Sequence, residues 1–198
     1  MVTNSELRRR AREQLGGNIF SNNWLLFVVV CIVAGVMNTI SSSVTCGIGG
    51  IILAGPILYG YARLTANLAN GQQKVEFSDF FKGFTEGFGR TFLLGLMTNL
   101  FTFLWSLLFI VPGIVKYYAY SMAPYIMQDD PNKNWKQCLD ESQEMMEGHK
   151  GQLFCLHLSF VGWILLGMLC LGVGTIFVVP YMQQSTANFY LSLKEQNS

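Results

Sequence analysis

Long apolar stretches alternate with short polar segments along the 198 residues of the chain. A helix that crosses a bilayer needs about 20 mostly apolar residues, because each residue adds about 1.5 Å along the axis and the hydrocarbon is about 30 Å thick. The chain is therefore predicted to be an all-α, polytopic membrane helix bundle, a single integral membrane domain over residues 1–198. The six stretches predicted to span are 20–41, 47–69, 90–110, 113–128, 151–171 and 175–193.

The six predicted spans pair into three hairpins with short, uncharged links at 41–46, 111–113 and 172–174. Basic residues instead precede the first, third and fifth spans or follow the sixth. Because Lys and Arg close to span ends remain in the cytoplasm, both termini are predicted to be cytoplasmic. The basic residues concerned are Arg8, Arg9, Arg10, Arg12, Lys74, Lys82, Arg90, Lys133, Lys136, Lys150 and Lys194.

An amphipathic helix is predicted before each hairpin. Apolar residues three or four positions apart form one face of such a helix. Beside a span, a stripe of this kind is typical of a helix that lies in the headgroup plane or packs on the cytoplasmic end of the bundle. The stripes are Leu7, Ala11 and Leu15; Phe77, Phe80, Phe81, Phe84 and Phe88; and Trp135, Cys138, Leu139, Ser142, Met145 and Met146.

The amphipathic helix and its hairpin recur over about 4–70, 76–128 and 133–194, which predicts a pseudo-threefold internal repeat. The second span of each hairpin has a proline near its start. Proline is well tolerated in the first turn of a helix, where an N–H group has no partner within the helix. The prolines predicted in first turns are Pro56, Pro112 and Pro180.

Composition supports a membrane location. Charged residues make up 13% of the chain and hydrophobic residues 51%, whereas soluble domains average about 25% charged residues. The net charge of +1 gives no field that would attract nucleic acid. The five cysteines are scattered, without C-x-x-C spacing, which fits neither a zinc site nor a disulfide framework. The first apolar stretch is long enough to span and is followed by no small-residue cleavage site, so it is predicted to be retained.

Five blocks follow one another along the chain: "SELRRRAREQL", "GPILYGYARL", "SLLFIVPGIVKYYAYSMAPYIM", "GHKGQLFCLHLSFVGW" and "PYMQQSTANFY". In this order they resemble a family of uncharacterised bacterial integral membrane proteins related to the membrane domain of glycerophosphodiester phosphodiesterases. The resemblance covers nearly the whole chain. It implies a six-helix bacterial membrane protein in the inner membrane, and it brings no catalytic residues.

Polar residues recur on one face of the even-numbered spans, four and then seven or eight positions after each proline. One hypothesis is a central polar cavity that holds an anionic or zwitterionic group, because polar residues inside spans often mark pathways. The other is helix packing, in which polar side chains bond across helices. The candidate cavity residues are Arg63, Asn67, Lys116, Tyr120, His157, Gln183, Gln184 and Asn188.

Two of these residues carry further expectations. No acid lies within any predicted span, so an inward Lys116 needs a carbonyl, hydroxyl, amide, water or bound anion as acceptor. His157 is predicted to be a neutral imidazole hydrogen-bonded to a neighbouring helix. The "QQSTAN" run is too polar for the sixth span to face lipid along its length.

The remaining polar groups suggest contact with the membrane surface. His149 and Lys150 are predicted to be interfacial anchors, rather than metal ligands with Glu144 and Glu147, whose spacing spreads over more than one helix face. Anionic lipids attract basic residues near the surface by about 1 kcal/mol each, which explains the first basic run better than nucleic acid does. That candidate lipid contact consists of Arg8, Arg9, Arg10 and Arg12.

No G-x-S-x-G, Walker A or H-E-x-x-H motif is present, so neither an enzyme nor a cofactor is expected. The favoured hypothesis is a non-catalytic membrane protein that contacts lipids or assembles with a protein partner at its amphipathic helices. The alternative is a small transporter or channel for an anionic or amphiphilic molecule, since symmetric repeats around polar, broken helices are common in transporters.

Overall fold

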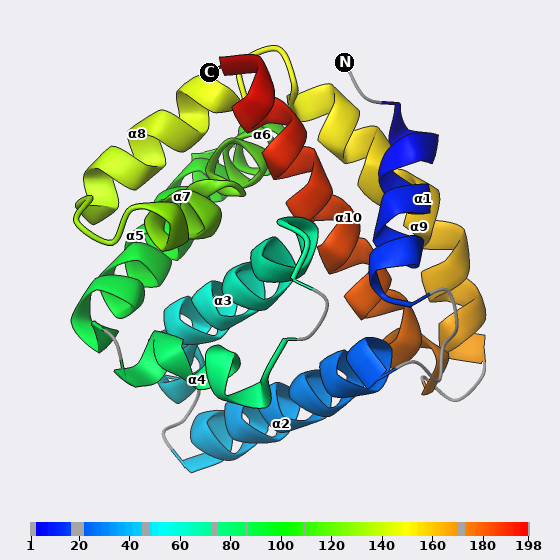
Figure 1. Cartoon of the computed structure of the whole chain (residues 1–198). Helices are drawn as coiled ribbons and strands as arrows, with labels where there is room; N and C mark the ends of the chain where they lie inside the picture. The colour runs from blue at the N-terminus through cyan, green and yellow to red at the C-terminus, as the bar shows by residue number, and fades with distance from the viewer. Residues whose placement is uncertain are drawn as a thin grey trace.

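In the computed structural model, the chain is described over residues 3–16, 22–44, 48–72, 75–85, 87–108, 110–169 and 173–197, and these ranges are almost entirely helical (Figure 1). The all-α prediction is confirmed. In chain order the helices are α1 (Asn4–Gln14), α2 (Asn22–Val44), α3 (Ile48–Ala69), α4 (Phe77–Thr85), α5 (Phe88–Leu108), α6 (Ile110–Tyr120), α7 (Ala123–Asp129), α8 (Trp135–Met145), α9 (Lys150–Leu169) and α10 (Val173–Asn197).

Five of the six predicted spans are single long helices, namely α2, α3, α5, α9 and α10. The fourth, predicted as one helix over 113–128, is instead broken into α6 and α7. Pro124 lies in the first turn of α7 and has no backbone N–H to donate to the carbonyl of Tyr120, four residues earlier, so α6 stops at Tyr120 and α7 starts at Ala123. With 11 residues, α6 is about 16 Å long and reaches only about halfway across a bilayer.

Two of the three proline predictions are wrong. Pro112 lies in the first turn of α6, but Pro56 lies inside α3 and Pro180 inside α10, because both helices begin about two turns before their proline. The Phe stripe is also shorter than predicted. Gly87 adopts φ +84°, a left-handed conformation that interrupts the helix, so Phe88 begins α5 and does not extend the face of α4.

The predicted amphipathic helices correspond to α1, α4 and α8, and their stripes pack into the protein. Leu7, Ala11 and Leu15 are fully buried, as are Phe80 and Cys138. Of the two alternatives, packing on the bundle therefore describes these helices better than lying free in a headgroup plane.

The centre of the molecule is formed by α3 and α10, which cross against each other and are surrounded by the remaining helices (Figure 1). The run from Gln184 to Asn188 in α10 is buried, which confirms that this helix does not expose its polar stretch. Both ends of the described chain lie on the same side of the molecule (Figure 1).

Large apolar side chains cover the outer faces of α2, α5, α6 and α9. Along α2 they recur every three or four residues, so they form one continuous stripe on the side that faces away from the bundle. The exposed set is Leu25, Val29, Ile32, Val36 and Ile40; Leu100, Phe103, Leu104, Trp105 and Leu107; Val111, Ile114, Val115 and Tyr117; and Phe154, Leu158, Val161, Trp163, Leu165 and Met168. We call this set the apolar belt.

Within the described residues, one helix is both long and apolar enough to cross a membrane by length and composition alone, the part of α2 from Asn22 to Ser43. It lies near the N-terminus, and signal sequences and core helices of soluble proteins pass the same test. The polar "QQSTAN" run lowers the mean hydropathy of α10. Composition alone therefore does not identify six spans.

Candidate functional site

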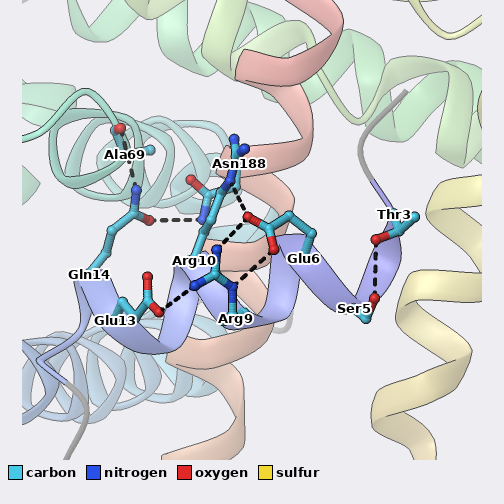
Figure 2. Close-up of polar contacts among 9 residues, drawn as sticks. All are labelled: Thr3, Ser5, Glu6, Arg9, Arg10, Glu13, Gln14, Ala69 and Asn188. Carbon is cyan, nitrogen blue, oxygen red and sulfur yellow. Dashed lines mark hydrogen bonds and ion pairs between the residues drawn. The ribbon is translucent and has the colours of Figure 1, made fainter.

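A cluster of buried side-chain amides joins α1 to α10. The Gln14 Oε1 accepts hydrogen bonds from Gln184 Nε2 at 2.9 Å and from Asn188 Nδ2 at 2.8 Å. Gln184 also donates to the carbonyl of Thr65 at 3.2 Å. Gln14 donates to the carbonyl of Ala69 at 3.4 Å (Figure 2). Two of the candidate cavity residues, Gln184 and Asn188, are thus brought together. In the described part of the chain they do not line a cavity but both donate to Gln14, a residue of the first amphipathic helix.

Three other candidates meet at a different place. Tyr120, His157 and Gln183 line a cavity of about 120 Å³ enclosed by α3, α5, α6, α9 and α10. His157 Nε2 lies 3.2 Å from Thr186 Oγ1 on α10, which confirms the predicted hydrogen bond to a neighbouring helix. Among the described residues, no charged side chain lines this cavity. The cavity therefore suits a neutral polar group better than an anion.

The break between α6 and α7 lies beside that cavity, where Ser121 is part of its lining. Ser142 of α8 satisfies the backbone at the break: its hydroxyl donates to the carbonyl of Ala119 at 2.7 Å and accepts the N–H of Met122 at 3.2 Å. Ser142 is fully buried. Helix α8 therefore holds the broken helix in its present geometry.

The remaining candidates lie apart. Lys116 Nζ donates to the amide oxygen of Gln143 on α8 at 2.5 Å and lies 5.5 Å from the ring centre of Trp105, so its acceptor is one of the predicted kinds. Arg63 donates to the Tyr59 hydroxyl at 3.5 Å and lines a separate space of about 50 Å³. Asn67 is half-buried on α3. The eight residues are thus not gathered around one cavity.

The four arginines of α1 divide into two pairs. Arg9 forms hydrogen-bonded ion pairs with Glu6 at 2.9 Å and with Glu13 at 3.0 Å, and Arg10 pairs with Glu6 at 3.0 Å (Figure 2). The hydrogen bonds from Arg9 and then Arg10 lower the pKa of Glu6 to about 2. Glu6 therefore stays ionised at neutral pH and keeps its ion pairs with Arg9 and Arg10.

Arg8 and Arg12 form no ion pair within the described ranges. Arg8 is half-buried, and its Nε has no hydrogen-bond partner among the described residues. Arg12 is exposed, one turn after Arg8 on the same helix. Of the predicted lipid contacts, these two retain an uncompensated positive charge.

The other predicted sites yield little chemistry. No three His, Cys, Asp or Glu side chains in the described ranges gather closely enough to hold a metal ion, so Glu144, Glu147 and His149 form no such group. Lys150 begins α9, and both it and His149 are half-exposed at that end. Cys31, Cys138 and Cys155 are free thiols, while Cys46 and Cys170 lie outside the described residues.

Sequence reasoning missed Gln14, Ser142 and Gln143. Gln14 lies three residues after Ala11, on the buried stripe of α1, so its spacing marked it as inward-facing. Ser142 appeared as a polar residue within an apolar stripe, which was the only signal of its role at the break. Nothing in the local pattern around Gln143 indicates that it accepts from Lys116.

A family model described as a protein of unknown function, DUF975, matches residues 1–119 and 110–197. Together the two matches extend over nearly the whole chain. No curated protein and no solved structure matches it. The match supports the predicted resemblance to an uncharacterised family, while the relation to glycerophosphodiester phosphodiesterases stays a prediction.

Proposed function

The chain belongs to the DUF975 family, whose function is unknown, and we propose that it is a multi-span protein of the bacterial inner membrane that contacts lipids without catalysing a reaction. In this proposal α2, α3, α5, α9 and α10 cross the bilayer, and α6 with α7 forms a broken sixth span. Both termini, with α1, α4 and α8, lie on the cytoplasmic side.

The apolar belt carries this proposal. Leu107 is 75% exposed, Phe103 64% and Trp163 60%, and all three belong to predicted spans. Val111, in the predicted link between the third and fourth spans, is 70% exposed. Soluble monomers rarely expose a contiguous apolar patch larger than a few hundred Å², since water opposes it. Contact with lipid tails has no such cost, because the tails are themselves apolar. We therefore infer that the apolar belt faces the hydrocarbon of the bilayer.

The distribution of charge supports the orientation. The ion pairs found in the described residues lie on α1 and α4, within the 133–141 segment, and between Lys194 and Asp129. These places are all on the predicted cytoplasmic side. The predicted outer ends of the hairpins bear no charged residue, as expected for loops that cross a membrane during insertion.

Lipid contact is favoured over protein assembly at the amphipathic helices. Most residues of their apolar stripes are buried or half-buried, so a protein partner would bind mainly their polar faces. Arg8 and Arg12 instead present positive charge on α1, shortly before the first proposed span. This arrangement suits the phosphate of an anionic lipid.

Replacing Arg8 and Arg12 together by glutamine is expected to weaken binding of phosphatidylglycerol by roughly 30-fold, because each basic residue near an anionic surface contributes about 1 kcal/mol. Native mass spectrometry of the full chain in a neutral detergent, titrated with phosphatidylglycerol, measures the change. The matched control replaces Arg9 and Arg10, whose charges Glu6 and Glu13 already offset. Equal losses in the two double variants would contradict selective binding by Arg8 and Arg12.

A second candidate function is handling of a small amphiphile. It is favoured by the cavity of about 120 Å³ beside the α6–α7 break, because broken helices around a polar site near the midplane are typical of transporters. The absence of charge in the described lining favours a neutral polar molecule.

For this second function, the purified protein is expected to retain a small polar molecule that His157→Leu loses. Mass spectrometry of the denatured, detergent-purified protein measures retention. Ser159→Ala is the control, because the Ser159 hydroxyl donates to the carbonyl of Leu156 in its own helix at 2.6 Å and to no other group among the described residues. If wild-type protein carries no such molecule, or both variants keep it, the cavity serves packing and this function is wrong.

A further inference from the structure

A groove of about 910 Å³ lies between α2, α3, α5 and the start of α10. It is distinct from the polar cavity and contains none of the residues predicted as sites. Ile51, Leu58, Leu100 and Phe103 line it and are also exposed, so the groove opens sideways into the apolar belt. Its described lining includes no charged side chain.

The length of the groove matches one leaflet of a bilayer. Along α3 the lining runs from Gly50 to Tyr61, a rise of about 16 Å. Half of a hydrocarbon core about 30 Å thick is about 15 Å. Gly50 lies near the start of α3, the end away from the proposed cytoplasmic side, so the groove lies within the leaflet away from the cytoplasm.

The volume suits a chain-like ligand. It falls within the range of about 300–1,000 Å³ found for ligand pockets. At roughly 30 Å³ for each heavy atom, the groove has room for about 30 such atoms, enough for an acyl chain and part of a second. The hollow exists because α2 and α3 present small residues towards it, including Ala34, Gly35 and Ala54.

Several polar groups in the groove already have partners. Asn99 Nδ2 donates to the carbonyl of Gly95 in its own helix at 2.8 Å. The hydroxyl of Tyr61 and the thiol of Cys31 interact with each other. A ligand therefore has no unsatisfied donor or acceptor to meet at these positions, and burying a polar ligand group there would be unfavourable.

We propose that this groove binds an acyl chain of a membrane phospholipid in the leaflet away from the cytoplasm. The proposal rests on the membrane location proposed above. The uncharged lining, the continuity with the apolar belt and the match to one leaflet together identify hydrocarbon as the occupant. In a bilayer the open groove takes up a lipid tail, and its side walls hold that tail longer than a flat protein surface does.

Groove-filling variants test the proposal. A side chain at Gly35 is accommodated, because a Cβ atom there meets no heavy atom within 4 Å, and removing a glycine from a helix interior favours the helix. Gly35→Trp and, from the opposite wall, Leu100→Trp are expected to lower retention of palmitoyl-oleoyl phosphatidylcholine by at least about tenfold, the equivalent of two methylene groups left unburied. Val29→Trp is the control, since Val29 is 48% exposed on α2 outside the groove.

The measurement is native mass spectrometry of each full-length protein after exchange from vesicles of that phospholipid into mild detergent. Selective loss in both filled variants, with Val29→Trp unchanged, supports the site. No retention by the wild type, equal retention by all four proteins, or retention of palmitate but not of phospholipid contradicts it. Melting temperatures identify any variant that fails to fold, and Ile57→Trp then replaces it.

Alkaline extraction of the same membranes separates this proposal from the proposed membrane location. A protein that stays in the membrane but holds no acyl chain contradicts the proposed groove site and leaves the membrane location intact.

Discussion

Phe80→Ala is expected to destabilise the protein by about 3–5 kcal/mol, the usual loss when a fully buried phenylalanine is truncated. Phe80 has no exposed surface. The centre of its ring lies 5.6 Å from that of Tyr61, 5.4 Å from that of Phe81 and 6.2 Å from that of Phe84. A Cβ atom at Gly60 would lie 2.7 Å from the Phe80 ring, so α3 and α4 are fitted closely around it.

Thermal unfolding in detergent, followed by circular dichroism, measures this loss. The matched control is Phe77→Ala on the same helix, because Phe77 is 36% exposed and its truncation leaves a smaller void. A melting temperature for Phe80→Ala as high as that of Phe77→Ala would mean that α4 does not pack on α3 as described.

Gly95→Val is expected to destabilise the protein by at least about 1–3 kcal/mol, the usual penalty for overpacking. Gly95 of α5 lies directly against Gly55 of α3, and a Cβ atom added at Gly95 would lie 2.6 Å from the Gly55 backbone nitrogen. Because that neighbour is backbone and not a flexible side chain, the two helices would have to separate.

Loss of folded protein on size-exclusion chromatography and a lowered melting temperature are the expected readings. Gly89→Ala provides the control on the same helix, where an added Cβ meets no heavy atom within 4 Å, and it is expected to leave stability unchanged or slightly raised. Normal stability of Gly95→Val would contradict the close contact of α3 and α5.

The helices themselves were largely predictable, because apolar spacing reports which face of a helix is buried. The stripes containing Leu7, Phe80 and Cys138 led to α1, α4 and α8, and all three residues are buried. Helix ends were harder to predict. Pro56 and Pro180 lie inside long helices, where packing against several neighbours offsets the missing hydrogen bond, and no local pattern reports that.

The candidate site was predictable only in part. Gln184 and Asn188 were identified as inward-facing, since polar residues inside an apolar helix seek partners. Their partner, Gln14, lies about 170 residues away in the chain, and its identity depends on how α1 docks on α10. Lys116 was placed with them because it follows its proline by the same number of residues, but α6 is short and turns Lys116 towards α8.

The central claim, a multi-span protein with both termini cytoplasmic, is tested most directly by the sidedness of cysteine labelling. Native Cys138 is unsuitable because it is fully buried, and Cys46 lies outside the described residues. In a chain whose five cysteines are replaced by alanine, Val111→Cys at the α5–α6 hairpin and Glu144→Cys on α8 are both exposed. An impermeant maleimide applied to intact spheroplasts is expected to label Val111→Cys, and to label Glu144→Cys only after permeabilisation. Labelling of Glu144→Cys in intact spheroplasts, or of both positions only after permeabilisation, would contradict the proposed membrane topology.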